Sequence, residues 1–305
     1  MCGLFGFLRY GNDKIDLDIL TESLASEAAI RGTDATGIAY NDRGRLRVYK
    51  KPVSAYKMEF DLPNIKALVG HTRHATQGDI KHNYNNHPFL GRAGKAEFAL
   101  AHNGVIINDT ELRDILNLPK TKVETDSYIA VQLIESKHVL DMNSLAYMAE
   151  KVQGSYSFSV LDKRNNIYLV KGDSPLSILH FPERKLYVYA STASILWKAL
   201  IDTDLFKELK IGAYEEIHIN DGEIVKLCSN GRIERRTFQY IDCDYYYDWR
   251  NYGIGYQSYF DSSMYINDIK SLAGGFGYVE DDIDELLHQG YTPDEITEYL
   301  YGVEV

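Results

Sequence analysis

A cysteine at the second position is the residue of this sequence best suited to covalent chemistry. Removal of Met1, which is usual before a small side chain, would leave Cys2 with both a thiol and a free α-amine. A free thiol has a pKa of about 8.5 and an α-amine has a pKa of about 7.7–8.0. The amine can therefore accept the thiol proton near neutral pH without a histidine. Taken alone, Cys2 is better explained as the start of a buried strand, because cysteine is a common core residue.

Short motifs follow Cys2 in a fixed order along the chain. They are Cys2-Gly3-Leu4-Phe5-Gly6, Arg31-Gly32-Thr33-Asp34-Ala35-Thr36-Gly37, Gly70-His71-Thr72-Arg73-His74-Ala75-Thr76, Asn86-His87-Pro88-Phe89, Ala101-His102-Asn103-Gly104-Val105-Ile106 and Glu124-Thr125-Asp126-Ser127. A single motif is weak evidence, since an isolated Asn-Gly is mainly a turn signal. The set as a whole resembles the glutaminase domain of class II glutamine amidotransferases, over about residues 2–235.

The resemblance implies a fold and a reaction. The family consists of N-terminal-nucleophile (Ntn) hydrolases, whose α+β fold is a four-layer αββα sandwich. By this resemblance Cys2 attacks the side-chain amide of L-glutamine and forms a glutamyl thioester. Ammonia leaves and water then releases glutamate. Asn103 and Gly104 correspond to the oxyanion-hole pair, and glycine suits that position because its backbone can approach a ligand closely.

The same resemblance supplies residues that would select the substrate. Arg73 corresponds to the residue that binds the α-carboxylate, a planar fork on a planar anion. Asp126 corresponds to the carboxylate that receives the α-ammonium group. We also expect Thr76 in the substrate site and Arg31 in a supporting role close to the nucleophile. The sequence departs from the family pattern at His74 and Gln77, where the loop that closes over glutamine is expected.

Hydrophobic periodicity predicts the elements that hold these motifs. Strand-like runs occur at 4–9, 37–40, 46–50, 67–71, 98–102, 156–161, 166–170, 186–190 and 216–219, and helical patterns occur at 17–30, 110–116, 125–136 and 142–151. Thr192 and Asp126 are candidate caps for the helices that follow them. The strands outnumber the helices and cluster in pairs, which favours α+β layers over a doubly wound sheet.

The chain changes composition near residue 240. The last 65 residues hold 14 acidic and 2 basic residues, so they account for the net charge of the whole chain, which is −11. They also hold 11 of the 24 tyrosines. We therefore expect a catalytic domain at 2–240, a Tyr/Gly-rich linker or wrap at 241–278, and a short acidic helical hairpin at 279–305. The first helix of the hairpin would span 281–288, and Thr292 would cap the second.

Several classes of protein and site are disfavoured. No apolar run approaches the roughly 18 residues of a membrane span, and the N-terminus does not read as a signal peptide. The acidic tail disfavours nucleic-acid binding. Three scattered cysteines favour a reducing, cytoplasmic setting. Five histidines fall within 32 residues, at His71, His74, His82, His87 and His102, but without acidic or cysteine residues at ligand spacing. We expect no metal and no cofactor.

Three functions remain open from the sequence. The favoured one is a stand-alone amidotransferase subunit that passes ammonia to a separate acceptor enzyme, with the acidic tail helping to dock that partner. The second is a self-sufficient amidohydrolase that acts on glutamine or another small amide. The third is a non-catalytic regulatory module that keeps the fold. The joint presence of Cys2, Arg73, Asn103, Gly104 and Asp126 argues against the third.

Overall fold

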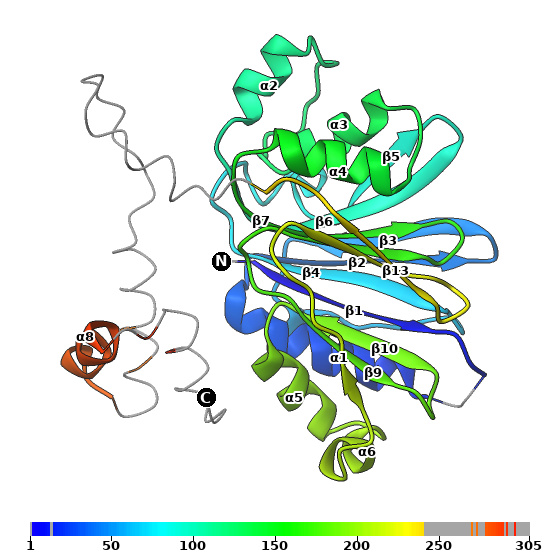
Figure 1. The fold of residues 1–305 in the computed structure, drawn as a ribbon, viewed down its shortest axis with the longest axis vertical. Helices are drawn as coiled ribbons and strands as arrows, with labels where there is room; N and C mark the ends of the chain where they lie inside the picture. Colours follow the sequence, from blue (N-terminus) through cyan, green and yellow to red (C-terminus); the bar gives the residue numbers. More distant parts are fainter. Residues whose placement is uncertain are drawn as a thin grey trace. The chain divides into compact units, whose positions relative to one another are not determined.

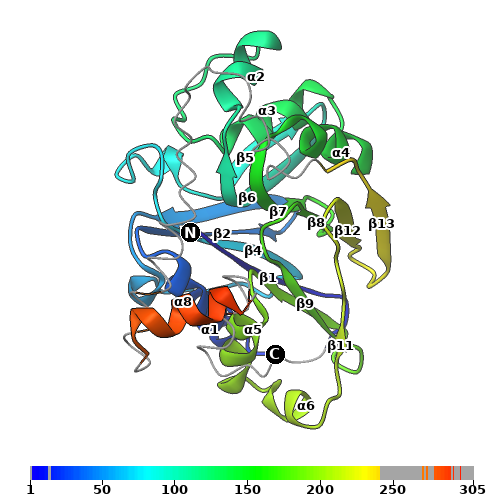
Figure 2. The same cartoon turned by 60° about the vertical axis from the view of Figure 1, so that its left-hand side comes forward.

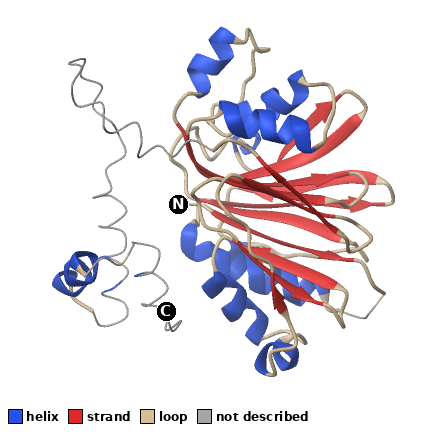
Figure 3. Ribbon diagram, viewed as in Figure 1, coloured by secondary structure: helices blue, strands red, loops and turns tan. Residues whose placement is uncertain are grey.

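The structure is a computed structural model that describes residues 2–12, 15–240, 270, 273, 278–289, 291 and 296. The chain divides into two units, residues 1–247 and 248–305. Two antiparallel sheets form the centre of the first unit, and helices cover the outer face of each sheet (Figures 1 and 3). Among the described residues, no helix combines the length and apolar character needed to cross a membrane.

The first sheet has seven strands in the order β11-β9-β10-β1-β4-β2-β3. Their bounds are β1 (Gly3–Arg9), β2 (Ala35–Asp42), β3 (Arg45–Lys51), β4 (Ala67–Arg73), β9 (Ser177–Phe181), β10 (Leu186–Ala190) and β11 (Glu215–Glu216). In β1, Phe5 and Phe7 pack against the outer helices, whereas Leu4 and Leu8 pack between the sheets. This alternation is the period of two expected for a strand that is covered on both faces.

The second sheet has six strands in the order β13-β12-β8-β7-β6-β5. Their bounds are β5 (Phe89–Ala93), β6 (Ala96–Ile106), β7 (Gly154–Asp162), β8 (Ile167–Lys171), β12 (Glu223–Leu227) and β13 (Ile233–Thr237). Small side chains from both sheets, including Ala67 and Ala99, meet in the layer between them. Short side chains allow the two sheets to approach closely at this contact.

The helices form the two outer layers, as Figure 2 shows from a second side. Three of them, α1 (Leu17–Ala28), α5 (Ala193–Ile201) and α6 (Phe206–Lys210), share a core with the first sheet. Three others, α2 (Asp109–Ile115), α3 (Tyr128–Ser136) and α4 (Met142–Lys151), share a core with the second sheet. The α+β class and the four-layer αββα arrangement expected from the sequence are therefore confirmed.

The local expectations had mixed outcomes. The side chain of Thr192 caps α5 by accepting a hydrogen bond from the backbone N–H of Ile195. The expectation that Asp126 caps a helix is wrong: the residue before α3 is Ser127, whose side chain makes no cap, and Asp126 bonds elsewhere. Four short strands, β5, β9, β12 and β13, were not predicted. Each has only five residues, although β8 and β10 are equally short and were predicted, so length alone does not explain the omission.

The second unit is described at few residues. Helix α8 spans Glu280–His288 and overlaps the first helix expected there. Its Ile283 packs in a small apolar cluster with Ala273 and Ile296. The second helix of the expected hairpin and the proposed linker at 241–278 fall largely outside the described residues, so both stay predictions.

Replacement of Asp141 by alanine tests how far local capping stabilises the layer above the second sheet. The Asp141 carboxylate accepts from the N–H of Ser144 at 2.8 Å, and the Ser144 hydroxyl accepts from the N–H of Asp141 at 3.0 Å, which makes a reciprocal cap on α4. Loss of such a cap costs about 1 kcal/mol. Urea unfolding of Asp141→Ala should show this loss, while Asp114→Ala, at an exposed carboxylate of α2, should not. Equal stability of the two variants would contradict the prediction.

Candidate active site

Cys2 lies immediately before β1, the central strand of the first sheet. Its thiol is 3.5 Å from the carbonyl oxygen of His74, and its own carbonyl accepts a 2.9 Å hydrogen bond from Nε of Arg31. Arg31 belongs to a short 3-10 helix, η1 (Ala29–Arg31), and is buried. The expected supporting residue therefore fixes the backbone of the cysteine and leaves the thiol free to face the loop after β4.

The environment of the Cys2 thiol keeps it protonated. Burial raises its pKa, and the negative charge of Asp126 acts in the same direction, while the positive charge of Arg73 opposes them. These effects also place Arg73 and Asp126 within electrostatic reach of the sulfur. A nucleophilic role would therefore require a base that removes the thiol proton.

Arg73 ends β4 and is a buried cation without a carboxylate hydrogen-bond partner among the described residues. Its guanidinium donates to the side-chain oxygen of Asn86 at 2.6 Å and to the carbonyl oxygens of Gln77 and Gly78. Burial lowers its pKa, although the Cys2 thiolate and the nearby acids favour the charged form. A buried charge that is bonded only to neutral acceptors can still bind an anion strongly.

Asn103 and Gly104 lie next to each other on β6, and each has a feature unusual for a strand. Asn103 is buried, yet its side-chain NH₂ has no hydrogen-bond partner among the residues that the structure describes. Gly104 has φ +135°, and a Cβ built there would lie 2.0 Å from the carbonyl oxygen of Ser155. Only glycine fits this backbone. The pair leaves an unused donor beside a backbone that no other residue could adopt.

Asp126 takes part in a chain of buried hydrogen bonds. One carboxylate oxygen accepts from the N–H of Ile106 at 2.7 Å, and the other accepts from the Ser127 hydroxyl at 3.2 Å. The Ser127 oxygen lies 2.8 Å from Nδ1 of His102. Since the hydroxyl has one proton and gives it to the carboxylate, His102 must donate from Nδ1. This chain fixes the orientation of the Asp126 carboxylate.

The two sheets are linked beside these residues. His71 on β4 pairs with Leu4 of β1 in register, and its Nε2 lies 2.9 Å from the carbonyl oxygen of His102 on β6. His102 directly precedes Asn103. The bridge therefore brings together the start of β1, the end of β4 and the part of β6 around His102, at one end of the sandwich. Cys2, Arg73 and Asn103 lie at this end.

The loop after β4 carries the remaining expected residue and the departures from the family pattern. Thr76, His74 and Gln77 are all exposed on this loop. Asp34 holds the loop by accepting from the N–H of Ala75 at 2.8 Å. The substrate role expected for Thr76 stays a prediction, since its side chain is not among the hydrogen-bonding groups that surround Arg73.

Three of the clustered histidines are buried, and their rings lie near one another at tilted angles. The ring centroids of His71 and His87 are 4.2 Å apart and those of His87 and His102 are 6.4 Å apart. Within the part of the chain that the structure describes, both ring nitrogens of His87 lack a hydrogen-bond partner. Burial lowers the pKa of all three, that of His71 to about 3. Among the described residues, no three His, Cys, Asp or Glu side chains are arranged to hold a metal ion.

Sequence reasoning gave no role to Asp34, Asn86, His102 or Ser127, although all four lie within the quoted motifs. Asn86 supports Arg73, and Ser127 with His102 supports Asp126. Their position next to the expected site residues was the available signal. Asn86 is 13 residues from Arg73, and Ser127 is 25 residues from His102, so only the folded chain shows which of these motifs supports which.

Comparisons with known proteins indicate a family for the chain. Residues 71–198 match the family model described as a glutamine amidotransferase domain. The chain is 30% identical over 259 residues to the glutamine–fructose-6-phosphate aminotransferase (isomerizing) of Staphylococcus aureus, which covers 80% of this chain and 40% of that relative. The enzyme of the same name from Staphylococcus epidermidis is 30% identical over 193 residues, covering 58% of this chain and 30% of the relative.

A solved structure shares the fold. The glutamine phosphoribosylpyrophosphate amidotransferase from B. subtilis, in complex with ADP and GMP, aligns with a TM-score of 0.62 and 21% identity, covering 78% of this chain and 49% of that one. This likeness shows that the two proteins share the αββα fold. This chain spans about two fifths of the length of the S. aureus aminotransferase.

The buried histidines predict a stability that falls in mild acid. In the unfolded chain they take up protons below about pH 6.5, whereas in the folded chain burial delays this, for His71 to about pH 3. The free energy of unfolding should therefore fall between pH 7 and 5.5, by about 1 kcal/mol for each histidine. Urea unfolding at several pH values measures this slope.

His87→Phe should flatten that slope, because it removes one buried imidazole whose nitrogens make no hydrogen bond. His218→Gln, at an exposed histidine, is the matched control and should keep the slope of the unmodified protein. An unchanged slope in His87→Phe would show that acid sensitivity comes from other groups.

Proposed function

Because the chain contains a class II glutamine amidotransferase domain, we propose that it hydrolyses the side-chain amide of L-glutamine, with Cys2 as the nucleophile. The observation that carries the proposal is the unused amide of Asn103. A buried donor without a partner costs free energy in the resting protein. That cost has a purpose if an oxyanion forms beside it during the reaction.

The α-amine of Cys2, exposed by removal of Met1, is the base in this proposal. It takes the thiol proton, and the sulfur adds to the amide carbon of glutamine. The negative charge moves to the amide oxygen, where the side chain of Asn103 and the N–H of Gly104 stabilise it. The carbon–nitrogen bond then breaks, the amine returns the proton to the leaving nitrogen, and ammonia departs from the thioester.

Water completes the reaction. The amine of Cys2 removes a proton from a water molecule, which adds to the thioester carbon. The carbon–sulfur bond breaks, the sulfur regains a proton, and glutamate is released. The raised pKa of the Cys2 thiol supports this division of labour, since a buried thiol remains protonated until a base acts on it.

The substrate is proposed to be a free amino acid because two opposite charges flank the thiol. Arg73 would bind the α-carboxylate and Asp126 the α-ammonium group. The Ser127 hydroxyl would orient the Asp126 carboxylate, and Nδ1 of His102 would orient the hydroxyl in turn. Arg31 would position Cys2, and Thr76 would contact the substrate from the loop.

The finer assignments belong to this proposal as well. We propose that the ammonia passes to an acceptor enzyme, and the name of the aminotransferases to which the chain is similar, which pairs glutamine with fructose 6-phosphate, supports an acceptor. That the acceptor is a separate chain, and that the reaction takes place in the cytoplasm, both stay predictions. A self-sufficient amidohydrolase remains the alternative, and it would turn over glutamine rapidly without any acceptor.

Replacement of Cys2 by alanine tests the nucleophile directly. The unmodified full chain should release glutamate from L-glutamine and should lack Met1 by intact mass, whereas Cys2→Ala should show only the background rate, since the thioester cannot form. Cys228→Ala, at a second cysteine remote in sequence, is the matched control and should retain activity. Retention of Met1 together with absence of turnover would refute the proposal.

Replacement of Ser127 by alanine tests the support of the ammonium site. Loss of one hydrogen bond to a charged group should raise the KM for glutamine about tenfold and change kcat much less, because Ser127 does not reach the reacting amide. Ser159→Ala, at another buried serine on β7, should leave KM unchanged.

A nitrogen-15 spectrum of the histidines gives a readout that does not need turnover. In the unmodified protein His102 should carry its proton on Nδ1, and Ser127→Ala should change that signal. A proton on Nε2 of His102 in the unmodified protein would contradict the hydrogen-bond chain, whatever the activity.

A further inference from the structure

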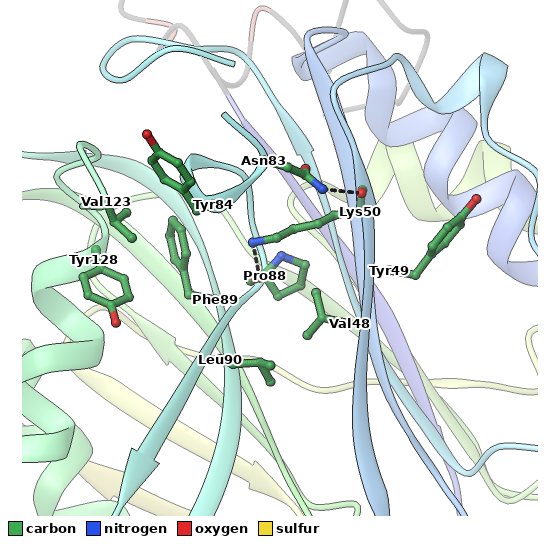
Figure 4. Close-up of a pocket in the computed structure, with 10 residues that line it drawn as sticks. All are labelled: Val48, Tyr49, Lys50, Asn83, Tyr84, Pro88, Phe89, Leu90, Val123 and Tyr128. Atoms are coloured by element: carbon green, nitrogen blue, oxygen red, sulfur yellow. Dashed lines mark hydrogen bonds between the residues drawn. The ribbon is translucent and has the colours of Figure 1, made fainter. Parts of the chain in front are cut away.

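A pocket of about 530 Å³ lies outside the proposed glutamine site, between β3, the start of β5 and the start of α3 (Figure 4). This volume falls within the range typical of small-molecule sites. The walls are mainly aromatic and aliphatic. Tyr84, Phe89 and Tyr128 provide rings, and Val48 and Pro88 provide aliphatic surface. Such walls suit the faces of a flat apolar group.

The aromatic wall is already ordered. The rings of Phe89 and Tyr128 meet edge to face with centroids 5.4 Å apart. Tyr84 stacks on His82 at 5.0 Å, and Nζ of Lys122 lies 4.7 Å from the Tyr84 ring centroid. A ligand therefore meets a wall whose side chains are held by neighbours, and little ordering of the pocket is needed on binding.

One cation projects into this pocket. Figure 4 shows the side chain of Lys50 extending from β3 so that its amine lies beside Phe89 and Pro88. Nζ donates to the carbonyl oxygens of Asn86 and Pro88 and lies 5.2 Å from the Phe89 ring centroid. Two acceptors leave one of its three N–H bonds for a ligand.

Lys50 has no anionic partner. Among the described residues its hydrogen bonds go only to neutral oxygens, and the charge that acts on it is that of Arg73, which is also positive. Burial and, to a smaller extent, Arg73 lower the pKa of Lys50 to about 8, so the amine is mainly charged at neutral pH. Two neighbouring cations whose hydrogen-bond partners are neutral favour the binding of a negatively charged group.

We propose that this pocket is a binding site for a small planar aromatic anion, whose ring stacks against Tyr84 and Phe89 and whose carboxylate, sulfonate or phosphate group binds the amine of Lys50. The aromatic wall selects a flat ring, and the unpaired cation selects the anionic group. Neither feature belongs to the proposed glutamine site, which is formed around Cys2, Arg73 and Asp126.

Asn86 connects the two sites. Its carbonyl oxygen accepts from Lys50, and its side-chain oxygen accepts from Arg73 at 2.6 Å. An anion at Lys50 therefore competes with the hydrogen bond that Asn86 accepts from Lys50, and so acts on the residue that holds the arginine of the glutamine site. Occupation of the pocket gives the chain a route by which a second small molecule affects the affinity for glutamine.

The test uses the full chain and two fluorescent probes that share their rings. One is 8-anilinonaphthalene-1-sulfonate, and the other is N-phenyl-1-naphthylamine, which lacks the sulfonate. The sulfonate probe should bind at one saturable site, and Lys50→Met should raise its dissociation constant about tenfold or more, since a hydrogen bond to a charged group is lost. Binding of the neutral probe should be nearly the same in both proteins.

Matched variants separate this effect from unfolding and from general charge. Lys66→Met removes an exposed lysine elsewhere and should leave sulfonate binding unchanged. Lys50→Arg keeps the charge and should restore most of the binding, and far-ultraviolet circular dichroism should match in all four proteins. Equal affinity for the sulfonate probe in Lys50→Met and in the unmodified protein overturns the proposal, whether or not the chain hydrolyses glutamine.

Discussion

A hydrogen bond between His71 and the carbonyl of His102 joins the two sheets at the end of the sandwich where the reactive groups lie. A carbonyl oxygen can only accept, so the ring of His71 has its proton on Nε2, and burial keeps this ring neutral. The bond ties β4, which runs beside β1, to β6. The distance between Cys2 and Asn103 is therefore fixed by the packing of the sandwich and needs no direct contact between the two residues.

At this end of the sandwich, the positively charged side chains are bonded to neutral oxygens. Arg73 and Lys50 both donate to carbonyl or amide oxygens, and Asn86 serves both of them. Each neutral acceptor orients its cation without cancelling the charge. The negative charges are kept apart, with Asp126 bound by the N–H of Ile106 and the hydroxyl of Ser127. The arrangement favours a ligand that carries both signs of charge.

The extent to which the sequence predicts this structure differs from residue to residue. The order of the motifs along the chain predicts that four residues act together: Cys2, Arg73, Asn103 and Asp126. The structure places all four at one end of the sandwich. Long strands such as β6 show a clear apolar pattern, whereas β12 and β13 were not predicted. Contacts between distant segments, such as His102 with Ser127, depend on the packing of layers, and no local pattern encodes them.

The carbonyl oxygens of Gln77 and Gly78 occupy Nη2 of Arg73 in the resting protein. A carboxylate that binds this guanidinium through two oxygens needs one N–H of Nη2, so it would displace one of these carbonyls and weaken the tether between the arginine and the segment that follows β4. In the proposed role of Arg73, ligand capture and loosening of this segment would be one event. The exchange would slow association, and a ligand with only a neutral amide at this end would gain less from it. The backbone around Arg73 would thus discriminate between ligands before any chemistry begins.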